Sequence, residues 1–416
     1  MPYPKHLFTL EVTLSTPLLI GWYKPEIADP LGLRTAEIKG IWRWWVRAFI
    51  CGVLYDNGFI TGIHTNDILL KPRREEVSII SKLVGKLGLG YSIGGESEAS
   101  RFILRIRTEN GIRISSYKKR SDKLYRIKLL TLNKSIEYIP ENTRFYIEVW
   151  KRYEKRDRNI NLAEELALKI LIIALQLNGF GKGGRRGLGS LDIISYKKVV
   201  IPINNVISKS LRDQLKEIYK GLTELIEEDK EIRKISRTRS EDYQIPPMPC
   251  ISKRVYRDGK KELPITRIFT VSNVSFTQIH NFFLRSMRAK VTNPKNPHYM
   301  DLLRNNYNAW ILGLPRSAGM KTGYLIPSEV NVERRASPLI VSYHKNNGVL
   351  GLRSGATFSL FISGDWPCKL KWRGGGGSTW QIDIDKSRLL KAYHDLYCVL
   401  DRYIVNINGR RLDIWP

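Results

Sequence analysis

A glycine-rich run between a predicted helix and a predicted strand constrains the fold of this chain more than any other feature. Residues 179–189 contain six glycines in eleven positions, together with Lys182, Arg185 and Arg186. Glycine lets a backbone approach a ligand closely and adopt conformations that other residues avoid. The run satisfies the G-x-G-x-x-G pattern, but dinucleotide sites of that kind need a strand before the glycines and a helix after them. The predicted order here is the reverse, so a dinucleotide site is excluded.

Hydrophobic periodicity predicts alternating strands and helices around this run. Period-two alternation indicates strands, and an apolar face with a 3.6-residue repeat indicates helices. In chain order we predict a strand at 7–14, a helix at 36–55 capped by Thr35, strands at 101–107 and 145–150, a helix at 161–178 that begins with an Asn161–Glu164 capping box, and a strand from 191 to 194. Residues 61–100 fit no regular element. This βαββαβ order is that of the ferredoxin-like fold, which also underlies many RNA-recognition domains.

The second half of the chain shows a less regular pattern of strands and helices. We predict a helix at 211–234, an extended proline-containing segment at 235–258, strands near 265–271, 339–343 and 357–362, and helices near 277–289, 299–312 and 386–403. We therefore expect an α+β chain with two domains. The first spans 1–205 and carries the glycine-rich run, and the second spans 206–416 and carries helical insertions.

The charge balance limits the class of partner. The 416 residues include 69 Lys+Arg and 40 Asp+Glu, which gives a formal net charge of +29. An excess of this size predicts a polyanionic partner, with nucleic acid as the first candidate and an anionic membrane as the second. The predicted basic segments do not form an amphipathic surface helix with an exposed apolar face, so we favour nucleic acid.

Cysteine spacing and hydropathy predict a cytoplasmic protein without metal or disulfides. The four cysteines, at positions 51, 250, 368 and 398, form no CxxC pair, and so few separated thiols suit a reducing compartment. No stretch approaches 18 uncharged apolar residues, so we expect no membrane-spanning helix. The histidines lack the spacing of a metal site, and we predict no cofactor and no catalytic residue.

Two groups of residues are candidates for binding RNA phosphates. Lys39, Arg43 and Arg47 recur every four residues, which places them on one helix face at steps of about 6 Å, close to phosphate spacing. An equally good interpretation is a solvated face over an aromatic core. The second group lies in the glycine-rich run, where cations stand beside exposed amides; its members are Gly181, Lys182, Gly183, Gly184, Arg185, Arg186, Gly187 and Gly189. A glycine-rich surface loop with solvated charges is the alternative there.

Two further segments carry weaker signals. The basic stretch 101–158 is interleaved with tyrosines at 117, 125, 138, 146 and 153, a combination that single-stranded nucleic acid binding requires, although strand tyrosines are more often core residues. The segment 314–323 lacks the spacing of a nucleotide phosphate loop, so we predict no nucleotide hydrolysis. It could still present Arg316 and Lys321 to a phosphate.

Several of these segments together resemble the RAMP superfamily of CRISPR proteins. The glycine-rich run resembles the family's hallmark loop, and residues 16–21 (TPLLIG) resemble the turn after its first strand. Residues 33–40 (LRTAEIKG), followed by Arg43, Trp44 and Trp45, resemble its first helix, and residues 333–339 (ERRASPL) a later segment. The likeness is greatest to the large two-domain RAMP subunit of type III-B (Cmr) effector complexes.

The resemblance implies a function as well as a fold. It implies two ferredoxin-like domains in tandem, and a non-catalytic subunit that binds guide RNA (crRNA) near its 3′ end and helps to capture target RNA in antiviral defence. Other RAMP subunits of the complex would be its partners, and a different subunit would cleave the target. Lys39, Arg43 and the loop 179–189 match the family's motif positions, and Arg335 in the later segment is a candidate for a second, weaker RNA contact.

Two alternatives remain open. The chain could be a metal-independent endoribonuclease that processes guide precursor RNA, with His6 or His298 as general acid or base. It could instead be a structural interaction protein whose charge only aids solubility. The few Gln, Met and Cys residues, with abundant Lys, Arg and Ile, hint at a thermophilic archaeal source.

Overall fold

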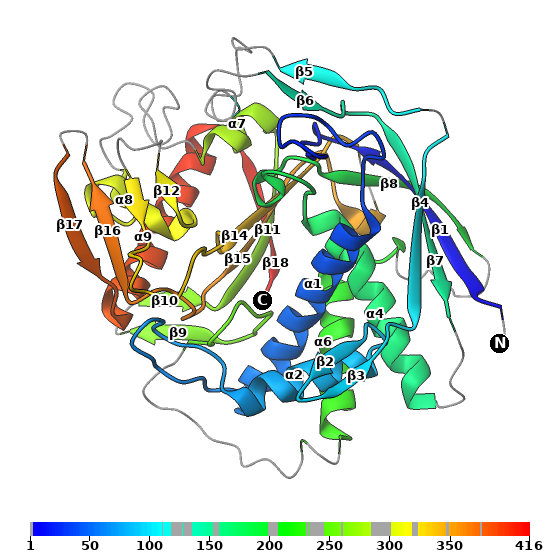
Figure 1. The fold of residues 1–416 in the computed structure, drawn as a ribbon, viewed down its shortest axis with the longest axis horizontal. Coiled ribbons are helices and arrows are strands. Elements are labelled where there is room, and N and C mark those ends of the chain that lie inside the picture. The colour runs from blue at the N-terminus through cyan, green and yellow to red at the C-terminus, as the bar shows by residue number, and fades with distance from the viewer. Residues whose placement is uncertain are drawn as a thin grey trace.

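A four-stranded antiparallel sheet organises the first half of the chain (Figure 1). The computed structural model describes residues 3–109, 111–117, 127, 135–152, 158–198, 207–229, 232, 245–258, 261–283, 301–317, 323–346, 349–374 and 377–416. The sheet order is β4-β7-β1-β8, where the strands are β1 (Lys5–Leu14), β4 (Phe102–Arg107), β7 (Arg144–Lys151) and β8 (Leu191–Lys198). In β1, Phe8, Leu10 and Val12 are fully buried while Thr9 and Glu11 are half-buried, as the period-two pattern predicts.

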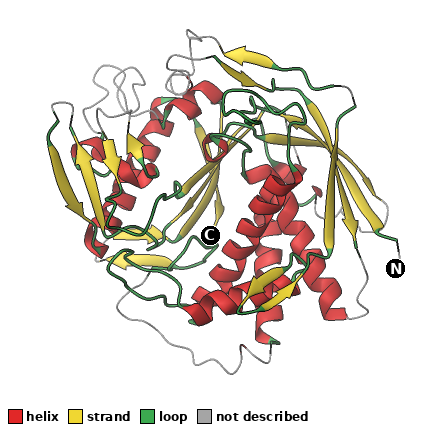
Figure 2. Cartoon of the chain, viewed as in Figure 1, coloured by secondary structure: helices red, strands yellow, loops and turns green. Residues whose placement is uncertain are grey.

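The helices of the first half lie beside this sheet. Figure 2 shows them side by side near the centre of the molecule. They are α1 (Thr35–Asp56), α4 (Arg158–Leu177) and, from later in the chain, α6 (Leu211–Glu227), which packs on both of the others. Two predicted caps are wrong. Arg34 is the N-cap of α1, because Thr35 is already helical, and Asn161 lies inside α4 rather than at its start.

Residues 61–100, which fitted no regular element, contain a helix and a small hairpin. These are α2 (Arg74–Lys86), β2 (Tyr91–Ile93) and β3 (Glu96–Glu98). Polar residues occupy much of α2, and at its N-terminus the Glu76 carboxylate accepts a hydrogen bond from Arg73 N at 2.8 Å. A second hairpin pairs β5 (Ser115–Tyr117) with β6 (Ile136–Tyr138).

A second four-stranded antiparallel sheet repeats the strand order of the first. Its order is β14-β15-β11-β18, with strands β11 (Thr266–Ser272), β14 (Leu339–His344), β15 (Gly355–Phe361) and β18 (Arg410–Trp415). Helix α7 (Phe276–Asn281) follows the first of these strands, and α9 (Lys386–Asn406) precedes the last. In both sheets the order is thus second, third, first and fourth by chain position. The predicted mixture of helices and antiparallel strands is confirmed.

A third sheet lies at the left margin of Figure 1. Its order is β12-β13-β16-β17, with strands β12 (Arg316–Ser317), β13 (Gly323–Leu325), β16 (Lys369–Arg373) and β17 (Thr379–Asp383). Nearby are α8 (Leu302–Asn305) and the 3-10 turn η4 (Ala309–Leu312), and a hairpin of β9 (Val255–Asp258) with β10 (Lys261–Pro264) lies below.

The two halves of the chain are joined by main-chain hydrogen bonds. Leu70 N donates to Gly364 O at 2.9 Å, and Leu69 N donates to Trp366 O at 2.8 Å. Gly52 of α1 touches the carbonyl of Ile251 so closely that a Cβ there would lie 1.8 Å from its oxygen. One buried core is continuous across both sheets. The domain boundary between residues 205 and 206 stays a prediction.

Within the described part of the chain, no helix has the length and apolar character needed to cross a membrane. The same residues contain no group of three or more His, Cys, Asp or Glu side chains placed to hold a metal ion.

Candidate nucleic-acid interface

The glycine-rich loop owes its glycines to contacts within the protein. It leaves α4, forms the 3-10 turn η1 (Gly184–Arg186) and closes through a bridge between Gly179 and Ser190. Gly181 has φ +71°, and a Cβ there would lie 2.4 Å from Leu19 O. Gly189 has φ +63°, and a Cβ there would lie 2.3 Å from Phe180 O. The close approach that the sequence suggested is therefore an approach of the chain to itself.

This loop and the turn after β1 form one unit. Lys182 N donates to Leu19 O at 2.6 Å, and Gly189 N donates to Pro17 O at 2.9 Å. The Thr16 hydroxyl donates to the Gly187 carbonyl at 2.7 Å. Residues 16–21 and 179–189, which lie far apart in sequence, are therefore neighbours at the N-terminal end of α1.

The two arginines of the loop face the second half of the chain. Arg185 donates to Ser337 O at 2.8 Å, and its guanidinium lies 4.8 Å from the Trp44 ring centroid. Burial, and then the nearby charge of Arg335, lower the pKa of Arg185 to about 10. Arg186 lies 5.6 Å from the Phe283 ring. Both side chains are only partly exposed and link the glycine-rich loop to the second half.

Arg335 is buried, with 8 % of its surface exposed. Its Nε donates to Asp365 O at 2.9 Å, and one terminal nitrogen reaches both Ser363 Oγ at 3.0 Å and Asp365 Oδ1 at 2.7 Å. The other donates to the Ala336 carbonyl at 2.8 Å. The guanidinium also stacks 4.7 Å from the Trp366 ring. All three nitrogens therefore donate within the protein.

The cations of α1 have a different environment. Lys39 and Arg43 are partly exposed, and Arg47 is exposed. Among the described residues, none of the three has a carboxylate within 4.0 Å of its charged nitrogens. Arg43 donates only to a main-chain carbonyl, Leu89 O, at 3.1 and 2.6 Å. These side chains form a partly exposed cationic row that no carboxylate of the described residues neutralises.

The three charges of this row repel one another. Burial, followed by the charges of Arg43 and Arg152, lowers the pKa of Lys39. Burial and the charge of Arg43 lower the pKa of Arg47. An external anion seated on the row would relieve this repulsion, because opposite charge within a few ångströms favours the charged forms.

Gly40 lies within the same exposed face of α1. It is exposed, and a Cβ added there would meet no atom within 4 Å. A glycine inside a helix costs roughly 0.5–1 kcal/mol relative to alanine. The protein itself makes no use of the missing side chain, so the flat spot between Lys39 and Arg43 is open to another molecule.

An aromatic loop at the N-terminal end of α1, where Arg34 donates to Gly21 O, was missed from the sequence. Residues 21–28 expose Trp22 at 56 % and Tyr23 at 67 %, with their rings 5.4 Å apart. Lys24 Nζ lies 5.8 Å from the Tyr23 ring centroid, and Lys182 donates its side-chain hydrogen bond to the Pro25 carbonyl. The available signal was two adjacent aromatic residues and a lysine between Gly21 and Pro25.

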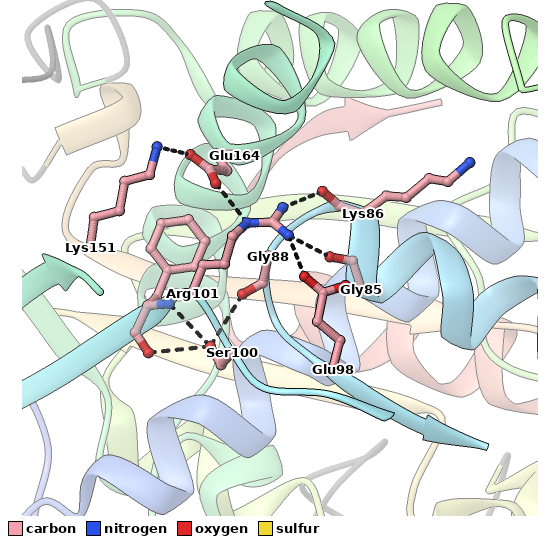
Figure 3. Close-up of polar contacts among 9 residues, drawn as sticks. Gly85, Lys86, Gly88, Glu98, Ser100, Arg101, Lys151 and Glu164 are labelled. Carbon is pink, nitrogen blue, oxygen red and sulfur yellow. Dashed lines mark hydrogen bonds and ion pairs between the residues drawn. The ribbon is translucent and has the colours of Figure 1, made fainter. Parts of the chain in front are cut away.

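The basic stretch 101–158 is not a uniform cationic surface. Figure 3 shows Arg101, which is 1 % exposed, enclosed by acceptors. Its Nε pairs with Glu164 Oε1 at 2.7 Å, and its terminal nitrogens reach Glu98 and the carbonyls of Gly85 and Lys86. Lys151 is also buried and pairs with the same Glu164 at 2.6 Å. Arg101 is a structural cation, because its hydrogen-bonding groups face the interior.

The tyrosines of this stretch have separate surroundings. The rings of Tyr117 and Tyr138 stack on each other with centroids 4.1 Å apart, and Tyr146 donates to Glu109. Tyr125 and Tyr153 lie outside the described residues.

One buried group has the connectivity of a catalytic triad. Ser342 Oγ lies 3.2 Å from His344 Nε2, and His344 Nδ1 lies 2.8 Å from Asp192 Oδ1. All three residues are at most 1 % exposed. A substrate cannot reach this buried serine. The role of the group is instead to join β8 of the first sheet to β14 of the second.

The histidines proposed for RNA cleavage have no such arrangement in the described structure. His6 Nε2 lies 3.0 Å from Thr9 Oγ1, and its ring packs 4.6 Å from Trp150. His298 and Lys321 lie outside the described residues.

Part of this chain matches a known protein family, and solved structures resemble its fold. Residues 11–192 match the family model of the RAMP superfamily. Among solved structures, the crystal structure of Cmr1 from Pyrococcus furiosus (apo form) is 16% identical over 98% of this chain and 98% of that one, with a TM-score of 0.48. A chain in the cryo-EM structure of type III-B Cmr-beta bound to cognate target RNA and AMPPnP, in the presence of ssDNA, is 14% identical over 97% of this chain and 100% of that one, with a TM-score of 0.52. Because the sequence identity is only 14%, the likeness to the Cmr-beta chain is evidence for the fold alone. The curated protein sequences contain no match to this chain.

Proposed function

We propose that this chain, whose residues 11–192 match the RAMP superfamily model, is a non-catalytic RNA-binding subunit of a type III-B CRISPR (Cmr) effector complex. The observation that carries the proposal is the partly exposed row of Lys39, Arg43 and Arg47 on α1, which has no carboxylate partner among the described residues. Its ligand is guide RNA near its 3′ end, with target RNA as a second contact and other RAMP subunits as neighbours.

The strand orders support a tandem of two ferredoxin-like domains. In each sheet the first strand lies between the third and the fourth, and all neighbours are antiparallel. A helix follows the first strand and another precedes the fourth in both cases. That is the βαββαβ arrangement shared by many RNA-recognition domains, and the third sheet and the hairpins are additions to it.

The chemistry of the interface suits a single strand of RNA. Three cations at steps of about 6 Å along α1 match successive phosphates, and Lys182 adds a fourth cation at the N-terminal end of the helix. Gly40 lets the sugar-phosphate backbone lie close to the helix. Trp22 and Tyr23 offer faces on which unpaired bases stack.

The glycine-rich loop has a supporting role in this proposal. Its glycines hold the turn at 16–21 against the N-terminal end of α1, which positions the aromatic loop. Direct contacts of Arg185, Arg186 and Arg335 with RNA stay predictions. These guanidinium groups lie against aromatic rings of the protein, and Arg335 also pairs with the Asp365 carboxylate.

A charge-matched pair of variants tests the proposal. The triple variant Lys39→Ala, Arg43→Ala, Arg47→Ala removes the α1 row. The control triple Arg212→Ala, Lys216→Ala, Lys220→Ala removes three exposed cations with the same four-residue spacing from α6. Both variants lose the same net charge, so non-specific attraction falls equally in each.

The measurement is binding of labelled single-stranded RNA to the full chain over a range of salt concentrations. The α1 triple should lose about 1 kcal/mol per phosphate contact, and its salt slope should fall by about one unit per contact. The α6 triple should keep most of its affinity. Equal losses in both variants would contradict the α1 assignment. Cleavage of repeat RNA by the purified chain in EDTA would contradict the non-catalytic assignment.

A further inference from the structure

A row of four side chains crosses the third sheet. Arg316 of β12 pairs directly with Tyr324 of β13, Tyr324 pairs with Trp372 of β16, and Trp372 pairs with Trp380 of β17. Directly opposed residues in neighbouring antiparallel strands place their side chains on the same face, about 5 Å apart. One arginine and three aromatic residues therefore line one face of the sheet in a continuous row.

The outer end of this row is an exposed aromatic cluster. The rings of Trp372 and Trp380 stack with centroids 3.9 Å apart and an interplanar angle of 26°. Tyr307, from the turn between α8 and η4, meets both rings edge-on at 5.5 and 5.3 Å. Along the row, exposure increases from the buried Tyr324 to Trp380 at 39 %, and Tyr307 beside the row is 40 % exposed. The cluster thus presents ring surface to solvent at the margin of the molecule.

The backbone holds Tyr307 at this cluster against its own preference. Its φ is +53°, in the left-handed region that costs a non-glycine residue of order 1–2 kcal/mol. A tyrosine tolerated in this conformation indicates that its ring is kept at a set place beside the two tryptophans.

The surroundings of the cluster favour a polyanion with aromatic groups. Arg316 and Arg304 both act electrostatically on Tyr324, so positive charge lies along the inner end of the row. An apolar protein surface gains nothing from cations at its rim, whereas an unpaired nucleobase uses the rings and its phosphate uses the cations.

We propose that Tyr307, Trp372 and Trp380 form a base-stacking site for single-stranded RNA, separate from the row on α1. In Figure 1 this sheet is at the left margin, and α1 lies between it and the first sheet at the right. The proposal rests on the proposed function only in taking RNA as the ligand. It adds a second contact, in the second half of the chain, that acts through stacking rather than through phosphate charge.

The test compares Trp380→Ala with Trp380→Phe in the full chain, using labelled oligouridylate and a salt series. Stacking does not depend on counterion release, so Trp380→Ala should weaken binding by about five- to tenfold while leaving the salt slope unchanged. Trp380→Phe should stay within about twofold of the wild type, because a phenyl ring still stacks. Tyr3→Ala removes a ring that is 95 % exposed elsewhere and serves as the control.

Different outcomes separate this proposal from the function proposed above. A normal affinity in both Trp380→Ala and Tyr307→Ala overturns the stacking site, whatever the α1 triple does. A normal RNA affinity together with weakened association with other subunits also overturns it and assigns the cluster to a protein contact. Loss of affinity in Trp380→Ala with no effect of the α1 triple supports the stacking site and contradicts the α1 assignment. Unfolding midpoints near that of the wild type confirm that each variant is folded.

Discussion

Cations on the exposed face of α1 and cations in the glycine-rich loop come from equally basic stretches of sequence, yet the fold treats them differently. Arg47 is exposed and has no carboxylate partner among the described residues. Arg185 is packed on Trp44 and donates to the Ser337 carbonyl. Arg101 is more enclosed still, because its guanidinium donates to two carboxylates and two main-chain carbonyls.

The difference separates cations that are still available to an external anion from cations that serve the fold. A guanidinium has five donors, and each must find an acceptor when it is buried. Arg101 and Arg335 have found theirs inside the protein, so they stabilise the fold. The α1 row keeps its capacity for an external anion.

The sharpest test of this contrast is Arg101→Met, which should give the largest effect on stability. Removing the guanidinium leaves Glu164 paired with Lys151 and leaves the Gly85 and Lys86 carbonyls without this donor, which should cost about 3 kcal/mol. Urea unfolding measures it. The control is Arg105→Met. Arg105 is exposed, its guanidinium lies 5.0 Å from the Trp150 ring centroid, and its loss should cost under about 1 kcal/mol. Similar losses in both variants would show that burial does not distinguish these cations.

A second test concerns the pH dependence of the link between the two main sheets. Burial raises the pKa of Asp192, but the hydrogen bond and charge of His344 outweigh it, so the pKa lies below its usual value. The ionised carboxylate therefore stabilises the fold above pH 4 or so, and this contribution disappears as the pH falls through the lowered pKa.

Asp192→Asn should thus lower the unfolding free energy by about 1–3 kcal/mol at neutral pH, and by less at the acidic end of the range. Denaturant unfolding of both proteins between pH 3 and 7 checks the sign. A difference that grows on acidification would contradict it.

A third test compares one cation of the α1 row with one cation of the glycine-rich loop. Arg47→Ala should reduce RNA affinity by about 1 kcal/mol and the salt slope by about one unit, with little change in stability. Arg185→Ala should do the reverse and lower the unfolding free energy by about 1–2 kcal/mol, because Ser337 O and Trp44 lose their partner. A reduced salt slope in Arg185→Ala would show that the glycine-rich loop contacts RNA after all.

The smallest effect is expected at Gly40. Gly40→Ala should raise the unfolding free energy by about 0.5–1 kcal/mol, because the helix gains propensity and no atom is in the way. Gly40→Gln should be similarly stable but should bind RNA less tightly, since its side chain occupies the flat spot. Thermal unfolding and RNA titration of the two variants separate these effects. Tighter RNA binding by Gly40→Gln would argue against close approach of the backbone there.

Much of the fold could be predicted because its elements follow simple patterns. The strand at 7–14 and the helix at 36–55 match β1 and α1 to within two residues, since both bury one regular apolar face. Strand β18 was missed because Arg410, Arg411 and Asp413 mask its alternation, and α2 was missed because its exposed face is long and polar.

The candidate site was harder to predict, because a cation's partners are set by tertiary contacts. Nothing near Arg335 in the sequence reveals that Asp365 and Trp366 enclose it. Likewise, the glycines at 181 and 189 suggested a ligand, whereas their close neighbours are the chain's own carbonyls.

The hydrogen bonds between the two halves also matter while the chain is being made. Leu70 and its acceptor Gly364 are 364 − 70 = 294 positions apart. At roughly 5–20 residues per second, a ribosome needs about 15–60 s to deliver the second partner after the first. During that time the main-chain amides of Leu69 and Leu70 have no acceptors from the C-terminal half. The N-terminal half therefore emerges with hydrogen-bond donors exposed that a later part of the same chain will pair.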